Sequence, residues 1–353
     1  MKHLAKRLLR RGITAVLHGT GLRRAFRRGR RGVPVLMFHN VGTLPGAEYI
    51  PGHMRISEQR LDRLLGALRR GGYGTLTVGQ MAEALARGEC PQDKVVLTFD
   101  DGYRDNRERL LPLLQRHGAT ATVFVQTGPL HGRINWLHHY FWVLHRQGPR
   151  ALGEQLAQRL SGAREAVAAL RALPAQPVAA EYQLKRVLKY SVSSADRDRL
   201  LAEIFAAAGG RDAELSREVW LSPDDCRALD RAGVELGAHT VNHLVLSSLD
   251  RETQRAEIAG SLRDLQGWLG HAVPSFAYPY GRSWDYNDDT RALLAELGFR
   301  SAITAMPGLN DPSTDRLQLR RIAVGEDARL GEILCEVDGV LDWFARRGLN
   351  LRS

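Results

Sequence analysis

The stretch KVVLTFDDGYRDN, residues 94–106, decides how this chain is interpreted. Its apolar part, VVLTF, is a continuous run rather than an alternation, which is typical of a parallel strand buried on both faces of a sheet. Two carboxylates, Asp100 and Asp101, follow at the carboxyl end of that strand, and Gly102 comes next. Ligand chemistry collects at this end of the strands in α/β folds. The alternative is that one aspartate caps the next helix and the other lies in a solvated turn.

Strand-like and helix-like segments alternate from residue 33 onward. The strand-like segments are VPVLMFHNV (33–41), VVLTF (95–99), TATVFVQ (120–126), GVELGAH (233–239), VPSFAYP (273–279), RSAIT (300–304) and LQLRRIAV (317–324). Helices are expected after Ser57, which can cap the first of them, and over residues 105–117, 250–269 and 288–297. Repeated strand, helix, strand units predict a mainly parallel sheet, closed or nearly closed as a barrel.

Residues 131–217 break this alternation. The segment is rich in Ala, Leu and Arg, has prolines at two joints, and opens with four aromatic side chains, Trp136, Tyr140, Phe141 and Trp142. We expect several helices inserted between two strands of the barrel, where they could roof a site. The alternative is that the aromatic residues pack a small core of the insertion itself.

The first 32 residues account for the net charge of +11. They hold eleven of the 50 Lys and Arg residues and none of the 39 Asp and Glu residues, so the remainder of the chain is formally neutral. Apolar residues recur within this arm at roughly helical spacing, at Leu4, Leu8, Leu9, Ile13, Val16 and Leu17. The pattern predicts a basic amphipathic helix that can lie on an anionic membrane face. A solvated tail is the alternative, and nucleic acid is disfavoured because Phe26 is the arm's only aromatic residue.

The arm is not typical of a secretory signal, because its apolar run ITAVLHG (13–19) is short and no small-residue cleavage site follows it. No stretch reaches the roughly 20 apolar residues of a transmembrane helix. Three cysteines, Cys90, Cys226 and Cys335, lie far apart without a CxxC pair. This favours a reducing compartment over a disulfide framework.

A second group of polar residues follows another strand-like segment, in GVELGAHTVNHLVLSSL (233–249). His239 and His243 are four residues apart, a spacing that places two imidazoles on the same side of a helical turn and suits one divalent ion. Two histidines and one carboxylate leave coordination positions open for water and substrate. A second carboxylate beside such a site can act as a base. In such a site, one of the adjacent aspartates would bind the metal and the other would accept a proton. Gly102 lets the backbone turn sharply after them.

TFDDG, HTVNH and FAYPYG, in this order at successive strand ends, resemble the motifs of the polysaccharide deacetylase family, the NodB-homology or carbohydrate esterase family 4 group. The resemblance covers roughly residues 33–125 and 218–325. It implies a distorted (β/α) barrel, within 33–353, that removes N-acetyl or less often O-acetyl groups from a sugar with the help of a metal. The arm (1–32) and the insertion (131–217) lie outside it.

The resemblance assigns roles to particular residues. Asp100 matches the general base, whereas Asp101, His239 and His243 match the metal ligands of the family, which bind zinc most often and cobalt, nickel or iron in some members. Tyr280, in the groove-wall motif with Pro279, matches the residue whose backbone N–H binds the oxyanion.

Two departures from the family pattern matter. Ala277 occupies the position of the motif arginine that restrains the base, so we expect Arg321 to do this work, with a structural salt bridge as the alternative. No histidine follows His271 to serve as the late general acid. His39 resembles the histidine of a permuted exopolysaccharide deacetylase subgroup, and we expect a protonated imidazole there with a pKa suited to neutral pH. A buried structural histidine is the alternative.

These observations favour deacetylation of an N-acetylglucosamine-type sugar in a bacterial glycan, or in a lipid-linked intermediate of exopolysaccharide or lipopolysaccharide biosynthesis. The expected location is the cytoplasm, with peripheral attachment to the inner membrane through residues 1–32. Two other functions stay open: hydrolysis of a non-sugar amide or imide by the same site, and glycan binding without catalysis. An open aromatic groove favours a glycan, whereas a closed pocket favours a small amide.

Overall fold

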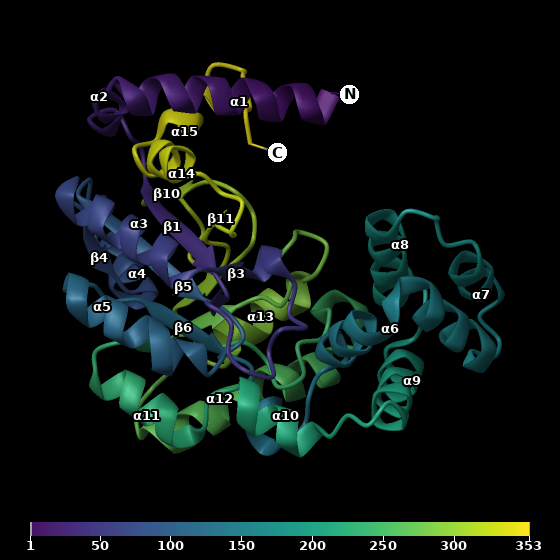
Figure 1. The fold of residues 1–353 in the computed structure, drawn as a ribbon. Coiled ribbons are helices and arrows are strands. Elements are labelled where there is room, and N and C mark those ends of the chain that lie inside the picture. Colours follow the sequence, from purple (N-terminus) through teal and green to yellow (C-terminus); the bar gives the residue numbers. More distant parts are fainter. Residues whose placement is uncertain (1, 353) are drawn as a thin grey trace. The chain divides into compact units, whose positions relative to one another are not determined.

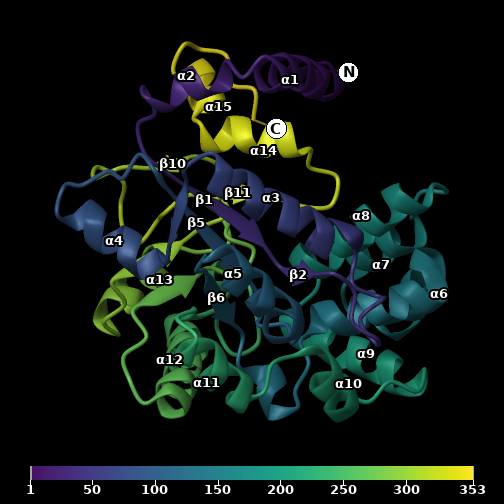
Figure 2. The same cartoon turned by 60° about the vertical axis from the view of Figure 1, so that its left-hand side comes forward.

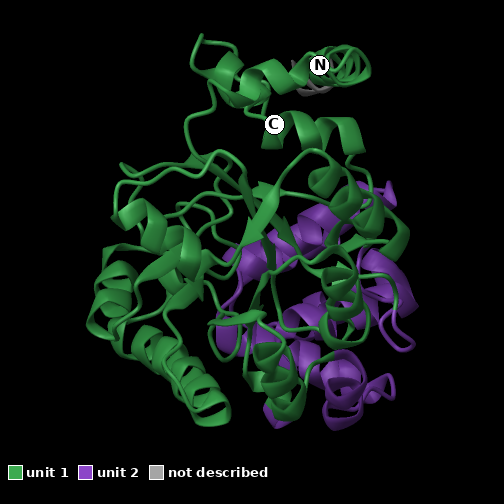
Figure 3. Ribbon diagram, turned by 90° about the vertical axis from the view of Figure 1, so that its left-hand side faces the viewer, with its two compact units in different colours: residues 1–43, 52–130, 220–353 green, residues 44–51, 131–219 purple. Residues whose placement is uncertain are grey.

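The computed structural model describes residues 2–352, and the side chains of this range except those of residues 2–5 and 7. Lys2, Leu4 and Arg7, which contribute to the predicted arm, therefore lie outside the described side chains. The described residues form two compact units (Figure 3). Unit 1 comprises the chain up to Thr43, Gly52–Leu130 and the chain from Trp220 onward, and unit 2 comprises Leu44–Pro51 and His131–Val219.

Unit 1 is built on one curled, mainly parallel sheet, as the alternation of segments predicts (Figure 1). Its strands are β1 (Val33–Phe38), β4 (Gly74–Leu76), β5 (Lys94–Phe99), β6 (Thr122–Val125), β7 (Glu235–Ala238), β8 (Ser275–Ala277), β9 (Ser301–Ile303), β10 (Leu309–Asn310) and β11 (Ile322–Ala323). Along the sheet the order is β10-β1-β5-β6-β7-β8-β9, with β4 beside β5 and β11 beside β1. The parallel strands from β5 to β8 end at one edge, so their carboxyl ends can gather polar residues.

The segment that contains β11 brings the two ends of the sheet together. Leu319 pairs with Ile303 of β9, and a few residues later Ile322 pairs with Leu36 of β1. Both pairings are parallel. The chain around residues 319–323 therefore links the last parallel strand to the first, which is the near-closure expected from the sequence.

Apolar side chains cover both faces of this sheet, as the continuous run VVLTF predicts. Val95, Leu97 and Phe99 belong to a large cluster under the surrounding helices, while Val96 belongs to a smaller one. The smaller cluster joins side chains from strands around the curl, namely Val35, Val96, Phe124, Ala277, Ile303 and Leu319. These strands form a rigid floor for the residues at their carboxyl ends.

In the described part of unit 1, ten α-helices and one π-helical turn precede, flank or follow the strands, and Figure 2 labels the α-helices. They are α1 (Lys2–Gly19), α2 (Arg23–Arg27), α3 (Glu58–Arg70), α4 (Val78–Ala86), α5 (Leu111–His117), α11 (Pro223–Arg231), α12 (Arg251–Leu269), α13 (Asp288–Glu296), α14 (Leu330–Val337), α15 (Val340–Ala345) and the π-helical turn η2 (Asn106–Leu110). Short elements are also present: β2 (Asn40–Val41) pairs with β3 (Arg55–Ile56), and η1 (Gly52–Met54), η3 (Gly128–His131) and η4 (Leu246–Ser248) are 3₁₀ turns.

Helix α3 illustrates how the sequence pattern determines the fold. Leu61, Leu64 and Leu65 form the apolar stripe expected of an amphipathic helix and are buried in the large cluster. Ser57 occupies the N-cap position, but its side chain makes no capping hydrogen bond. The hydroxyl donates instead to Glu326 Oε1, 3.1 Å away. Ser57 therefore lies at the predicted N-cap position, but its side chain does not cap the helix.

Unit 2 consists of α6 (Trp136–Arg159), α7 (Arg164–Arg171), α8 (Pro177–Tyr190), α9 (Ser194–Ala207) and α10 (Asp212–Val219). Trp136 packs against Tyr140, and Trp142 lies 4.7 Å from Phe205 between ring centroids. The aromatic residues at the start of the insertion thus pack within unit 2. This agrees with the alternative given above, in which they form a small core of the insertion itself. Residues 44–51 also belong to unit 2, where the hydroxyl of Tyr49 lies 2.9 Å from Nδ1 of His138. Among the described helices, none is long and apolar enough to cross a membrane.

Candidate metal centre

Three side chains from two strand ends converge in unit 1. Asp101 follows β5, and His239 and His243 follow β7. Oδ1 of Asp101 lies 3.7 Å from Nε2 of His239 and 3.6 Å from Nε2 of His243. All three are buried, and one potential ligand atom from each lies within 4.8 Å of the others. Two imidazole nitrogens and one carboxylate oxygen are a donor set that suits zinc and several other divalent ions. The residues therefore fit the metal that the sequence implies.

The surroundings of His239 prepare its Nε2 for this role. Nδ1 donates a hydrogen bond of 2.7 Å to the carbonyl oxygen of Ala277, at the end of β8. Because Nδ1 carries the proton, the lone pair of Nε2 is directed at the group that includes Asp101. Burial lowers the pKa of His239, and the nearby carboxylate of Asp100 opposes that shift only in part. His239 is therefore neutral near pH 7, which is the form that binds metal.

Backbone conformation concentrates strain at this site. The non-glycine residues with positive φ in the described chain are Asp101 (76°), Thr240 (63°), His243 (56°) and Tyr280 (61°). Left-handed backbone is costly for such residues and is retained where the surrounding structure fixes it, often at functional sites. The prediction that the two histidines share a helical turn is wrong. Residues 239–245 form a loop, and the left-handed turns at Thr240 and His243 bring the two imidazoles together.

Gly102 has the sharp turn that the sequence suggests, with φ of 69°. A Cβ atom at this position would lie 3.0 Å from Cγ1 of Val125 and 3.3 Å from its Cα. Glycine therefore satisfies two requirements at once, a left-handed backbone and a close approach to β6. Neither Asp100 nor Asp101 caps the following helix, since Asp105 occupies the N-cap position of η2.

Asp100 lies beside the three-residue group and is paired with Arg321. Nη1 of Arg321 donates to Oδ1 of Asp100 at 2.6 Å, and the two side chains are 1% and 4% exposed. Nε of Arg321 donates to the carbonyl oxygen of Thr304 at 2.7 Å, which fixes the guanidinium in place. Burial alone would raise the pKa of Asp100, but Arg321, together with nearby histidines, outweighs it and lowers that pKa. Asp100 is therefore ionised and able to accept a proton.

His39 follows β1 at the same end of the sheet and is partly exposed. Desolvation lowers its pKa to about 4, although the carboxylate of Asp100 acts in the opposite direction. The expectation of a pKa suited to neutral pH is therefore wrong for the protein without substrate, in which His39 is neutral. Nδ2 of Asn106 lies 3.4 Å from the carbonyl oxygen of His39 and 2.8 Å from Oδ1 of Asp105, so the start of η2 supports this position.

Tyr280 follows β8 in a tight turn in which the N–H of Gly281 donates to the carbonyl oxygen of Pro279 at 2.7 Å. The rings of Tyr280 and His243 are 4.7 Å apart between centroids, so the turn lies against the candidate metal ligands. The N–H of Ala305 donates to the carbonyl oxygen of Gly281 at 2.8 Å, which ties the turn to the segment after β9. The structure thus brings Tyr280 to the same site.

Several supporting residues could not be found from the sequence. Glu257 of α12 accepts from the backbone N–H of Asn242 at 2.8 Å and from its side-chain amide at 2.6 Å. Oγ1 of Thr240 accepts from the N–H of His243 at 3.0 Å. These bonds hold the loop between the two histidines. The polar residues Thr240 and Asn242 are visible in the pattern HTVNH, but the partner of Asn242 in a distant helix has no local signal.

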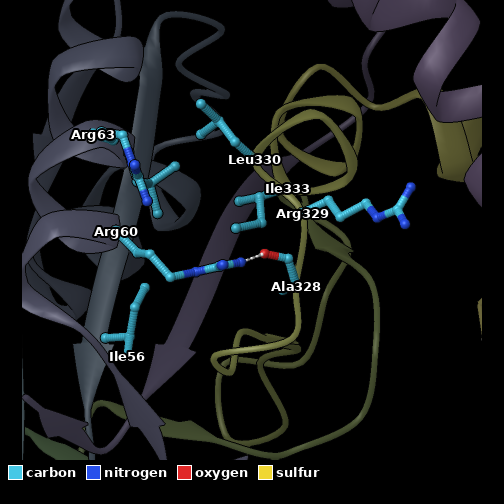
Figure 4. A pocket seen from close by; sticks show the side chains of 8 residues that line it. Ile56, Arg60, Arg63, Ala328, Arg329, Leu330 and Ile333 are labelled. Carbon is cyan, nitrogen blue, oxygen red and sulfur yellow. Dashed lines mark hydrogen bonds between the residues drawn. The ribbon is translucent and has the colours of Figure 1, made fainter.

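A pocket of about 270 Å³ elsewhere in unit 1 lies between α3 and the start of α14 (Figure 4). Ile56, Leu64 and Ile333 contribute apolar walls, and Arg60 donates a hydrogen bond to the carbonyl oxygen of Ala328. None of the acidic or histidine residues described above lines it. The candidate chemistry therefore lies at the strand ends and not in this pocket.

Comparison with known proteins agrees with this arrangement. The family model described as polysaccharide deacetylase matches residues 87–147 and 193–302. A Bacillus subtilis (strain 168) protein, YxkH, carries a provisional polysaccharide deacetylase name. It is 21% identical over 293 residues, which are 83% of this chain and 71% of that protein.

Solved structures show the same fold. The Streptococcus pyogenes deacetylase PplD, determined in complex with acetate, has a TM-score of 0.56 at 20% identity, covering 86% of this chain and 97% of that one. IcaB from Ammonifex degensii has a TM-score of 0.55 at 18% identity, covering 87% and 97%. A de-N-acetylase from Aggregatibacter actinomycetemcomitans has a TM-score of 0.54 at 16% identity, covering 85% and 98%.

The curled parallel sheet, with two aspartates and two histidines at its strand ends, defines the class as a barrel enzyme of the NodB type. The family match makes the assignment more specific: over residues 87–147 and 193–302 the chain is similar to the polysaccharide deacetylase family, and YxkH is a relative with a name of the same kind. The family resemblance of the three sequence motifs is thereby confirmed.

Proposed function

We propose that this chain is a metal-dependent hydrolase that removes N-acetyl groups from an acetamido sugar of a bacterial glycan or of a lipid-linked glycan intermediate. The observation that carries the proposal is the group of Asp101, His239 and His243 beside the ion pair of Asp100 and Arg321. This arrangement combines a site for one divalent ion with an ionised carboxylate that can act as a base. Zinc is the ion we favour, with cobalt, nickel or iron as substitutes.

Asp101, His239 and His243 would hold the ion, which when bound supplies Lewis acidity and lowers the pKa of a water molecule. Asp100 accepts a proton from the attacking water because its carboxylate is ionised and held in place by Arg321. The water oxygen forms a bond to the acetyl carbon. The N–H of Tyr280 stabilises the negative charge that develops on the carbonyl oxygen.

His39 supplies the proton that the leaving nitrogen needs. Since the pKa of His39 is about 4, the imidazole is neutral before reaction and must gain a proton during it. The proton that Asp100 takes from water is the available source. Cleavage of the C–N bond then gives acetate and the amino sugar, and one water molecule is consumed in each turnover.

The proposal includes a location on the cytoplasmic side of the inner membrane, with peripheral contact through residues 1–32. The absence of acidic residues from this arm supports contact with anionic lipid. Such contact would bring the site to lipid-linked substrates of exopolysaccharide or lipopolysaccharide synthesis.

The test is acetate release from N-acetylglucosamine oligomers by chelated protein, before and after reconstitution with zinc or cobalt. We expect metal to restore release in the wild type and not in Asp100→Asn. A matched control is Asp338→Asn, because Asp338 is also buried and paired with an arginine, Arg23, but belongs to no part of the site. Stoichiometric metal binding without acetate release from any sugar would favour a non-sugar amide. Failure to bind metal would leave a catalytically inactive glycan-binding protein.

A further inference from the structure

The arginines and lysine of helix α1 whose side chains the structure describes face the rest of unit 1. Nη2 of Arg10 lies 3.0 Å from Oε2 of Glu332, and Nε of Arg11 lies 3.3 Å from Oε1 of the same carboxylate, in α14. Lys6 donates to the carbonyl oxygen of Arg352. Further along α1, Ile13 and Leu17 pack against the apolar cluster of Cys335, Val340, Leu341 and Leu351. The described cations of α1 therefore serve attachment of the helix to unit 1.

The opposite face of α1 is apolar and open to solvent. The exposed residues of α1 from residue 8 onward are Leu8, Leu9, Gly12, Ala15, Val16 and Gly19, and those of the turn that follows it are Thr20, Gly21 and Leu22; none of these is charged. Leu8 is 60% exposed, Val16 is 62% exposed and Leu22 is 57% exposed. Figures 1 and 2 show α1 at the periphery of unit 1, lying over α14 and α15. We call the side chains of Leu8, Leu9, Val16 and Leu22 the apolar face. A soluble protein rarely leaves such a face uncovered without a partner.

Exposed arginines follow this face directly. Arg24 and Arg28, one helical turn apart in and after α2, are both exposed. They line a cavity of about 360 Å³ together with Arg23, Arg27 and Tyr73. Arg27 is fixed over the ring of Tyr73, with Cζ 3.9 Å from the centroid, and Arg23 is paired with Asp338. Since those two arginines are held by the protein, Arg24 and Arg28 are the ones available to an external anion.

From this arrangement we infer that the apolar face enters the acyl boundary of an anionic lipid leaflet while Arg24 and Arg28 bind lipid phosphates beside it. The inference deepens the membrane part of the proposed function and rests on it. An apolar helix face next to a basic cluster is the chemistry that recognises such a leaflet. A second copy of the chain fits less well. A stable dimer buries about 800 Å² on each partner, which is more than four half-exposed aliphatic side chains provide.

The experiment is co-sedimentation of the full chain with vesicles of phosphatidylcholine containing 30 mol% phosphatidylglycerol, compared with pure phosphatidylcholine. We expect binding to the anionic vesicles and at least about tenfold weaker binding to the neutral ones. The triple variant Leu8→Ser, Leu9→Ser, Val16→Ser should lose about tenfold or more of the partition coefficient, because three apolar side chains no longer enter the lipid. The double variant Arg24→Gln, Arg28→Gln should lose a similar factor at low salt and less at high salt.

The matched controls lie on α8 of unit 2. Val178 is 82% exposed and Arg186 is also exposed, so Val178→Ser and Arg186→Gln make the same chemical changes at another surface and should leave partitioning unchanged. Equal binding to neutral and anionic vesicles, or equal loss in the controls, would overturn the inference. So would a dimer in light scattering that the triple variant dissociates without any vesicle binding. Acetate release from a soluble oligomer, measured on the same samples, reports separately on the deacetylase, and Asp100→Asn should still bind vesicles.

Discussion

The guanidinium of Arg321 donates to the carboxylate of Asp100 at 2.6 Å, although the two residues are 221 positions apart in the chain. The contact arises because the segment around Arg321 lies along β1, next to β5, whose carboxyl end carries Asp100. Asp100, the proposed base, is therefore held in place by the element that brings the sheet toward closure.

Replacing Arg321 with methionine should lower both stability and activity. Removal of one partner from a buried ion pair typically costs roughly 3 to 5 kcal/mol in the free energy of unfolding. In the wild type, the lowered pKa of Asp100 stabilises the fold above about pH 4, and this contribution is lost as the pH falls through the folded pKa. Without Arg321, burial dominates and raises the pKa of Asp100. The acidic limb of the kcat/KM profile should therefore move to higher pH.

Arg23→Met provides the comparison, since Arg23 forms a buried pair with Asp338 outside the site. It should lose comparable stability in urea unfolding but keep the wild-type pH profile of kcat/KM. If both variants shifted that profile equally, the role of Arg321 would be structural only.

Removal of metal should lower the thermal stability of the protein, which can be measured without any substrate. A ligand that binds only the folded state at 100 times its Kd adds about 2.7 kcal/mol to the free energy of unfolding. We expect zinc to raise the Tm of chelated wild-type protein and to have much less effect on Asp101→Asn, which loses the charged ligand. His271→Gln, at an exposed histidine outside the site, should respond to zinc as the wild type does. An equal rise in Tm for Asp101→Asn would show that zinc binds elsewhere.

Gly102→Ala should impair the site more than a similar change at another left-handed glycine. Both Gly102 and Gly118 have positive φ, at 69° and 60°, so alanine costs about 1 to 2 kcal/mol of backbone strain at either position. A Cβ at Gly118 meets no atom within 4 Å, whereas one at Gly102 approaches Val125 at 3.0 Å. Urea unfolding should therefore show the larger loss for Gly102→Ala, and acetate release should fall in that variant alone. Equal losses of stability in the two variants would mean that β6 moves away from the added Cβ without lowering the free energy of unfolding.

Stability should also fall between pH 6.5 and pH 5, in part through His138 of unit 2. Burial lowers the pKa of His138 to about 3, so the unfolded chain binds a proton in this range and the folded chain does not. This difference in proton binding lowers the free energy of unfolding by roughly 1 to 2 kcal/mol per such histidine at pH 5. His138→Gln should show a correspondingly flatter dependence of unfolding free energy on pH. His271→Gln should not flatten it, because the pKa of His271 is raised by its bonds to Ala272 and Asp230.

The sequence predicts the curled sheet and the strand-end location of Asp100, Asp101 and His239 because these depend on local patterns. It could not predict the loop conformation at His243, since a four-residue spacing fits a helix as well as two left-handed turns. The sequence does not reveal strand β4, because this strand is short and its residues are only partly buried. The inclusion of residues 44–51 in unit 2 depends on contacts such as that between Tyr49 and His138, which no local pattern reveals.

The inward orientation of Lys6, Arg10 and Arg11 on α1 also has no sequence signal. An amphipathic pattern shows that a helix has two faces but does not say which of them meets the protein. Glu332 of α14 decides this by attracting Arg10 and Arg11, and it lies more than 300 residues away in sequence.

Closure through the segment around Leu319 and Arg321 also sets an order of events during synthesis. At about 5 to 20 residues per second, 221 residues take the ribosome roughly 10 to 45 s. Throughout that interval a nascent chain holds Asp100 without its guanidinium and lacks the segment that bridges β9 and β1. A product released after His243 but before this segment carries both aspartates and both histidines but has an open sheet edge and no arginine beside Asp100. A chain that ends before Arg321 therefore lacks both the partner of Asp100 and the segment that pairs with β1.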